Sequence, residues 1–229
     1  MMKPEMKRKY YYILWALLLA LSVYLCIDKK SKLETLDYSN IDSAAVYVLE
    51  NWGGDAINVD TPWRFNPLIS FDELKKYSDL IVRVKAISSR GKNNCTITET
   101  EILDVYQGEK NMLNNIVYVY EWGELYFQHT YFARDGYTLM TPQQEYVLFL
   151  NKFYNPYSEE EAWLLANVFH GKIITNWPEG WSVIDDLKSG TLIYSEVSDW
   201  GLITTDEMVF NCYKDIYENV LSLTGTEYE

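Results

Sequence analysis

At 229 residues, this chain is long enough for one domain of ordinary size together with a short additional segment. Hydrophobic residues make up 48% and charged residues 23%, which excludes an intrinsically disordered protein, and the 20 Tyr and 8 Trp favour β structure. Residues 1–32 carry seven positive and two negative side chains, a net of +5, which leaves −18 for residues 33–229. So acidic a domain excludes nucleic acid as a partner and should stand away from anionic headgroups.

An uncharged run of 18 residues, 10–27, lies near the N-terminus. A helix of this length reaches about 27 Å, close to the roughly 30 Å hydrocarbon core of a bilayer. Tyr10, Tyr11, Tyr12 and Trp15 stand at its first end, where amphipathic rings favour a membrane interface. The run therefore predicts a transmembrane signal anchor, followed by a stalk over residues 28–38.

Two other processing routes remain open for this segment. A cleaved signal peptide needs small residues before the cut, and the best match, Ala20-Leu21-Ser22, lies inside the apolar run. A lipoprotein signal would use Cys26, but Val23-Tyr24-Leu25 precedes it instead of the usual small residue. Four positive residues precede the run and three follow it, which favours residues 1–9 in the cytoplasm and residues 39–229 outside the cell.

Two helices are expected before the first strand. Residues 39–52 combine cap residues with an apolar face that includes Ala44, Ala45 and Val48, and two glycines end the segment. Ser70 and Glu73 are spaced as a capping box, which predicts the start of a second, short helix.

Alternation of apolar and polar residues predicts a series of strands after that helix. The long Thr-rich strand changes parity near Ile102-Leu103, which indicates a bulge. The strand 145–153 is apolar on both faces and should be central. Residues 161–169 read as a strand, with a helix as the open alternative, and a final helix is expected over 206–223 with Thr204 or Thr205 as its cap. The expected strands are 79–87, 95–106, 116–122, 124–132, 145–153, 161–169 and 172–175.

Four motifs within 71–153 carry a resemblance: YSDLIVRVKAIS, TITETEILDVYQGE, IVYVYEWG and TPQQEYVLFLNKF. They resemble a pattern of small secreted or lipid-anchored proteins of Gram-positive, clostridial-type bacteria. Such domains are similar to the OB-fold barrels of the netrin-like, metalloprotease-inhibitor-like class. The resemblance implies a mainly β (α+β) fold, an OB-like antiparallel β-barrel over about 71–175 with flanking helices. Inhibitor members use an N-terminal Cys, whereas the N-terminus here is the predicted anchor.

No catalytic or metal-binding motif is evident. His129 and His170 are the two histidines, and they lie 41 residues apart without the spacing of a zinc site. The sequence has no nucleophile elbow and no phosphate-binding glycine loop. We therefore expect no enzyme activity, no cofactor and no metal. Cys95 and Cys212 can form one disulfide or remain two buried thiols.

Aromatic residues near predicted turns are the candidate binding groups, because exposed rings can stack on sugars or anchor a protein partner. The alternative is that they fill the core. These candidates are Trp122, Tyr126, Phe127, Tyr131, Trp177 and Trp181. The sequence favours a non-catalytic, membrane-tethered extracellular domain that binds an envelope protein or peptide. A module binding cell-wall glycan is the alternative, and a hydrolase with an unfamiliar site is the least favoured.

Overall fold

The computed structural model describes residues 12, 14–26, 41–49, 62–92, 95–121, 126–127, 130–134, 136–154, 162–184 and 192–225. The chain divides into two compact units, Met1–Leu36 and Asp37–Glu229. In the first unit residues 14–26 are helical. Among the described residues, no helix combines the length and the apolar character that crossing a membrane requires. The predicted 10–27 span extends beyond the described part of this helix.

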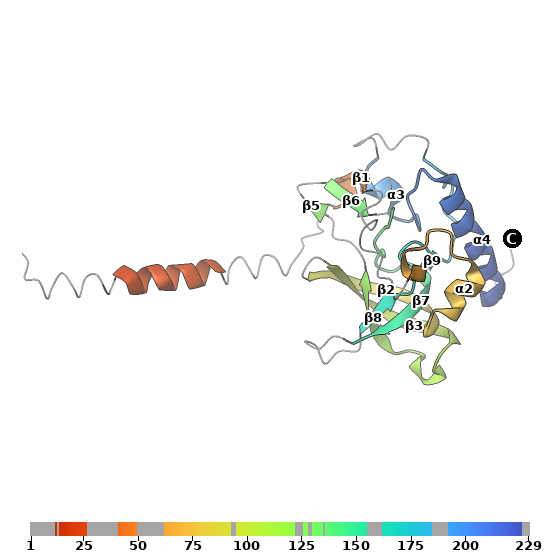
Figure 1. Ribbon diagram of the computed structural model, residues 1–229, viewed down its shortest axis with the longest axis horizontal. Helices are drawn as coiled ribbons and strands as arrows, with labels where there is room; N and C mark the ends of the chain where they lie inside the picture. The colour runs from red at the N-terminus through yellow and green to blue at the C-terminus, as the bar shows by residue number, and fades with distance from the viewer. Residues whose placement is uncertain are drawn as a thin grey trace, which may run out of the picture. The chain divides into compact units, whose positions relative to one another are not determined.

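Five strands of the second unit close into a mixed β-barrel (Figure 1). The neighbours around the ring are β2 (Leu80–Lys92), β3 (Cys95–Gln107), β4 (Ile116–Glu121), β8 (Ala162–Leu165) and β7 (Glu145–Phe153), which pairs again with β2. Four of these pairs are antiparallel, whereas β4 and β8 are parallel. The prediction of a barrel is confirmed, but its description as antiparallel is wrong for this pair.

Local sequence signals account for the start of the barrel. Ser70 and Glu73 form the predicted capping box at the N-terminus of α2 (Phe71–Lys76): the Ser70 hydroxyl accepts from the Glu73 amide, and the Glu73 carboxylate accepts from the Ser70 amide. In the β2–β3 hairpin Arg83 lies opposite Asp104, and Val84 lies opposite Ile102. Leu103 is therefore the extra residue of a bulge, as the change in parity indicates.

β7 is the central strand. Its residues Tyr146 to Leu150 are all buried, and it pairs with β2 along one edge and with β8 and β9 (Lys172–Ile174) along the other. The strand reading is confirmed for residues 162–165, which form β8, and the remainder of the apolar run passes into a turn.

The helix expected over residues 39–52 is wrong. Ile41–Ser43 form a 3-10 turn (η1), and Ala45–Leu49 form β1, which pairs in parallel with β6 (Thr130–Arg134). β6 also forms a hairpin with β5 (Tyr126–Phe127). Strand pairing overrides the weak helix propensity here, because Val46 enters the core while its neighbour Tyr47 is half-buried, a period of two that a helix cannot provide.

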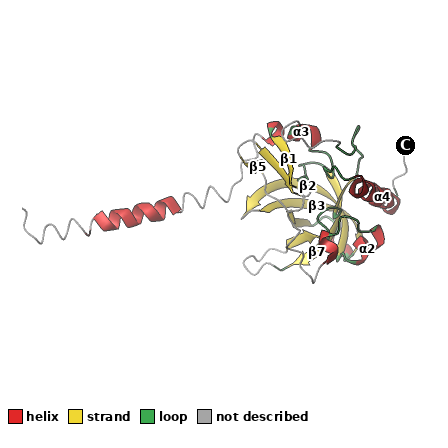
Figure 2. Ribbon diagram, turned by 45° about the horizontal axis from the view of Figure 1, so that its top comes forward, coloured by secondary structure: helices red, strands yellow, loops and turns green. Residues whose placement is uncertain are grey.

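Helices α2 and α4 lie side by side against one side of the barrel in both views (Figures 1 and 2). The predicted C-terminal helix is confirmed as α4 (Glu207–Thr224), but its cap is Asp206, whose carboxylate accepts from the amides of Met208 and Val209. α4 buries Val209, Tyr213, Ile216, Tyr217, Val220 and Leu221. The remaining short elements are η2 (Pro62–Phe65), η3 (Lys110–Met112) and α3 (Tyr194–Val197).

Candidate functional site: a groove between α2 and α4

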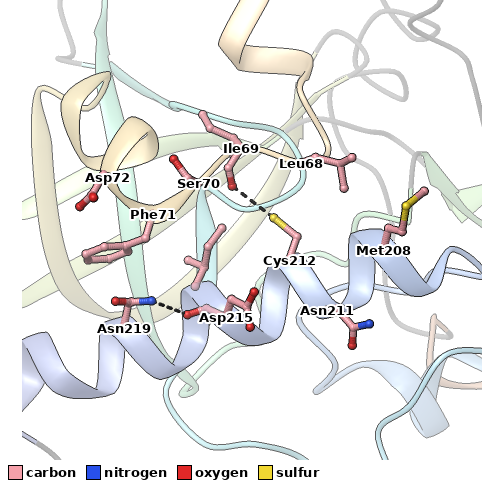
Figure 3. A pocket seen from close by; sticks show the side chains of 11 residues that line it. Leu68, Ile69, Ser70, Phe71, Asp72, Met208, Asn211, Cys212, Asp215 and Asn219 are labelled. Carbon is pink, nitrogen blue, oxygen red and sulfur yellow. Dashed lines mark hydrogen bonds between the residues drawn. The ribbon is translucent and has the colours of Figure 1, made fainter.

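An open groove of about 600 Å³ separates the segment that enters α2 from the outer face of α4 (Figure 3). The first wall is a continuous stretch, Leu68 to Asp72, so its position is fixed by the capping box that starts α2. The second wall comes from one stripe of α4. The residues of that stripe are Met208, Asn211, Cys212, Asp215, Ile216 and Asn219.

The helical period explains why α4 can serve the core and the groove together. Met208, Cys212, Asp215 and Asn219 follow one another at intervals of four, three and four residues, which places them on one face. Val209 and its buried companions point to the barrel instead. α4 therefore exposes a stripe that changes from apolar at its first turn to polar at its middle.

The two ends of the groove differ in chemistry (Figure 3). Leu68 and Met208 lie together at one end, and they are 49% and 64% exposed. Phe71, Asp72 and Asn219 lie toward the other end, where Asp215 projects from α4. Large apolar side chains left exposed together at one end of a groove are typical of a contact surface for another molecule.

Cys212 lies at the middle of the groove, where its Sγ donates to the carbonyl oxygen of Ile69 at 3.2 Å. Burial and, to a smaller extent, the nearby Asp215 carboxylate raise the pKa of this thiol to about 11. It is therefore protonated at neutral pH and lacks the thiolate character of a catalytic nucleophile. The structure forms no disulfide between Cys95 and Cys212, which leaves the alternative of two thiols, and Cys212 connects the two groove walls through its hydrogen bond to Ile69.

The floor behind the first wall is fixed by Asn167. Its Nδ2 donates to the carbonyls of Trp63 at 2.7 Å and Asn66 at 2.9 Å, while its Oδ1 accepts from the amides of Phe169 and His170. One amide side chain thus ties η2 to the turn that follows β8. The backbone leading into Leu68 is consequently held in place before any ligand arrives.

His170 supports the same backbone. Its Nε2 lies 2.7 Å from the carbonyl oxygen of Pro67, which can only accept, so Nε2 carries the proton. Burial lowers the pKa of His170 to about 4, and Nδ1 has no hydrogen-bond partner within the described part of the chain. A neutral, enclosed imidazole of this kind packs and supports the wall rather than exchanging protons with a substrate.

The barrel interior contains a second polar cluster, centred on Glu121. This carboxylate is 1% exposed and accepts from the Tyr137 hydroxyl at 2.7 Å, from the Met140 amide at 2.8 Å and from the Thr98 hydroxyl. Three donors from β3 and the 137–140 segment therefore satisfy the charge. The cluster fixes the chain between β6 and β7.

Lys172 extends this cluster from β9. It is 2% exposed, its Nζ donates to the carbonyl and to the hydroxyl of Thr138, and it lies 4.3 Å from the centre of the Tyr137 ring. Burial lowers the pKa of Lys172 to about 8, although the charge of Glu121 acts in the opposite direction. Because these groups are enclosed and already hydrogen-bonded, they stabilise the barrel and offer no reactive surface.

The aromatic residues proposed as binding groups are largely structural. Tyr131 and Trp181 are 2% and 5% exposed, and each donates to a backbone carbonyl, of Tyr137 and Leu202 respectively. Trp177 is half-buried and its ring centre lies 4.3 Å from that of Trp181. The prediction that Tyr131 and Trp181 meet a ligand is therefore wrong, because both rings fill the core.

The other aromatic candidates cannot be judged in the same way. Trp122, like His129, lies outside the described residues, and for Tyr126 and Phe127 the structure describes the backbone of β5 alone. None of the residues predicted for binding lines the groove. Its residues were missed because Leu68 stands alone in a loop and Met208 reads as one more apolar position of an amphipathic helix.

No metal centre accompanies the groove: within the described ranges, no three His, Cys, Asp or Glu side chains come together in a way that could hold an ion. No protein-family model matches the sequence, and a search of curated proteins finds no relative. The functional inference therefore depends on the geometry of the groove and on the chemistry of its walls.

Proposed function

We propose that this chain is a membrane-tethered, extracytoplasmic interaction domain that binds a protein or peptide of the cell envelope in the groove between α2 and α4. The observation that carries the proposal is the pairing of exposed Leu68 and Met208 at one end of a preformed groove of about 600 Å³. Preformed, concave sites of this size with apolar walls and a few polar groups are where ligands usually bind.

The strand arrangement supports an OB-like barrel of the netrin-like class. The ring order β2-β3-β4-β8-β7 contains a single parallel pair, β4 with β8, as in a five-stranded Greek-key barrel. A closed barrel satisfies its own strand edges, so partners are bound by the elements around it. Fold by itself does not give function, and the groove is the feature specific to this chain.

The tether is supported by the sequence of residues 10–27, which carries no charge and is flanked by basic residues. The charge distribution of +5 on residues 1–32 against −18 on the remainder supports a domain that is held by its anchor and repelled by the anionic membrane surface. Protease digestion of intact cells tests the sidedness. We expect loss of the domain with protection of a short N-terminal fragment, and protection of the domain would contradict it.

Site-specific photo-cross-linking tests binding in the groove. A photoreactive residue at Asn211, which is exposed on the groove wall, is compared with one at Glu109, which is exposed on the turn after β3. In the full chain in its own membrane, we expect a discrete protein adduct from position 211 that Met208→Ser abolishes. Equal adducts from both positions, or none from position 211, would overturn the proposal.

Binding of cell-wall glycan is a second candidate, favoured by a separate polar pocket of about 350 Å³. Its lining includes the amides of Gln143, Gln144 and Asn176, together with Arg83, whose Nη1 lies 3.8 Å from the Glu145 carboxylate. Amides and paired charges suit sugar hydroxyl groups. If this candidate holds, the full chain sediments with isolated cell wall and Asn176→Leu reduces the bound fraction, whereas Met208→Ser does not.

A further inference from the structure

The groove has charges of one sign along it. The charged side chains that line it are the carboxylates of Asp72 and Asp215, one on each wall, and both residues are exposed. The wider surface has the same sign, since residues 33–229 carry −18. A partner with acidic side chains would be repelled here, and a cationic partner would be attracted and oriented.

The apolar end of the groove provides a second kind of contact, in addition to the negative charge. Leu68 and Met208 come from opposite walls and are both exposed, so an apolar side chain placed between them would bury surface on each. Burial of apolar surface from water is favourable, and the adaptable thioether of Met fits side chains of different shape. The groove therefore has one apolar subsite and one anionic subsite.

The spacing of the two subsites follows from α4. Met208 and Asp215 are seven residues apart on one helical face, which corresponds to about 10 Å along the axis at about 1.5 Å per residue. A peptide in the extended polyproline II conformation covers this distance in about three residues, at about 3.1 Å each, and its three-residue turn places positions i and i+3 on the same face. In such an extended ligand the apolar and the cationic side chain would therefore occupy positions i and i+3.

The length of the groove favours an extended ligand over a helix. Its first wall is a single stretch of five residues, Leu68 to Asp72. A helix needs about two turns, or eight residues, to place two side chains of one face about 10 Å apart, whereas an extended segment needs four residues. A four-residue extended segment is therefore the shortest ligand that reaches both subsites.

We propose that the groove binds an extended peptide segment whose apolar side chain lies between Leu68 and Met208 and whose Lys or Arg, three residues away, lies beside Asp215 on the α4 wall. This inference rests on the proposed function and specifies the partner's chemistry. The partner is a polypeptide with a positively charged segment. The recognition is independent of any catalytic step.

The test is a binding titration of the full chain, in detergent micelles, with short fluorescein-labelled synthetic peptides. The probes contain Leu-Ser-Gly-Arg in an otherwise Gly/Ser sequence, the reversed order, and two counterparts in which Arg is replaced by Glu or Leu by Ser. Binding is measured by fluorescence anisotropy. We expect either the Leu-Ser-Gly-Arg peptide or the reversed peptide to bind at least about tenfold more tightly than the Glu and Ser counterparts. Each counterpart lacks one feature, the positive charge or the apolar side chain.

Protein variants locate the two subsites. Asp215→Lys should weaken binding of the Arg peptide by about tenfold and improve binding of the Glu peptide, while Glu109→Lys, with the same change in net charge, leaves both within about twofold. Asp72→Asn tests the opposite wall independently. Met208→Ser should weaken binding, whereas the change Leu113→Ser, at an exposed apolar residue that does not line the groove, should not.

The outcomes separate the inference from the proposed function. If position 211 cross-links to a protein but the Arg peptides bind no better than their counterparts, or if Asp215→Lys has no more effect than Glu109→Lys, the inference is overturned and the groove remains a binding site of another chemistry. If position 211 gives no adduct, or no more than position 109, the proposed function fails, and the inference that rests on it fails with it. The inference and the proposed function are both supported if tight peptide binding is weakened by a change in the anionic subsite and also by a change in the apolar subsite.

Discussion

The interior of the barrel and the groove beside it use similar residue types in opposite ways. Inside, the Glu121 carboxylate accepts three hydrogen bonds, and Lys172 is enclosed by Thr138 and Tyr137. In the groove, Asp72 and Asp215 are exposed, and Leu68 and Met208 are left uncovered by the described chain. The difference separates polar groups that hold the fold from those available to a partner.

Removal of Glu121 should have the largest effect on stability. Glu121→Ala leaves Tyr137, Thr98 and the Met140 amide without their acceptor and leaves Lys172 as an uncompensated buried charge, so we expect a loss of about 3–5 kcal/mol in the free energy of unfolding. Urea denaturation of the variant and the unmodified chain measures this loss of stability. Glu109→Ala, on an exposed turn, should stay within about 0.5 kcal/mol. A similar small loss in Glu121→Ala would show that the interior cluster is not structural.

His170 should make the domain sensitive to acid. Its pKa is lowered from 6.5 to about 4, so the unfolded state binds a proton in this window and the folded state does not. Stability is therefore complete above pH 6.5 and falls by about 3 kcal/mol as the pH is lowered to 4. Urea midpoints measured across this range should fall less steeply in His170→Gln, which can still donate to Pro67. Equal slopes in the two proteins would contradict the buried, neutral histidine.

Lys172 should give the same trend, stability rising with pH, in a separate window at the alkaline side. Its pKa is lowered from 10.5 to about 8, so the unfolded state holds the extra proton between these values and stability rises with pH. We expect a gain of about 2 kcal/mol between about pH 8 and pH 10 that is absent in Lys172→Met. The comparison concerns the slope alone, because the substitution also removes the hydrogen bonds to Thr138. A flat profile in the unmodified chain would contradict the account.

The groove should tolerate substitution without loss of fold. Leu68→Ser combined with Met208→Ser removes side chains that are half-exposed or more, so we expect the free energy of unfolding to change by no more than about 0.5 kcal/mol. The same pair of changes should abolish the cross-link from position 211. Differential scanning calorimetry of the double variant checks the first expectation. A large loss of stability would mean that these residues belong to the core.

Local patterns in the sequence predict much of the barrel. The alternation in β2, the continuous apolar run of β7, the bulge at Leu103 and the capping box at Ser70 depend on neighbours within a few residues, and the structure confirms all of them. β1 was mistaken for a helix because its partner, β6, lies more than 80 residues further along the chain. Pairing with a distant strand decides such short segments, and no local pattern reveals it.

The groove could not be predicted for the same reason. Its walls meet where Cys212 donates to Ile69, two residues separated by 143 positions. The abundance of aromatic residues predicts binding groups elsewhere. Composition cannot, however, distinguish a ring that fills the core, such as Trp181, from one that contacts a ligand. The exposed Met208 becomes informative when its position opposite Leu68 is known.

The most direct measurement uses the methionine methyl groups as reporters of where the cationic peptide binds. In full-length protein labelled with ¹³C at the methionine methyls, the tighter-binding of the Leu-Ser-Gly-Arg peptide and its reversed form is added while the spectra are followed. The account predicts that the Met208 signal, at the apolar end of the groove, shifts with saturation, while that of Met140, which is 2% exposed inside the barrel, does not. Saturable binding without a shift of the Met208 signal would contradict the assignment of the groove as the binding site.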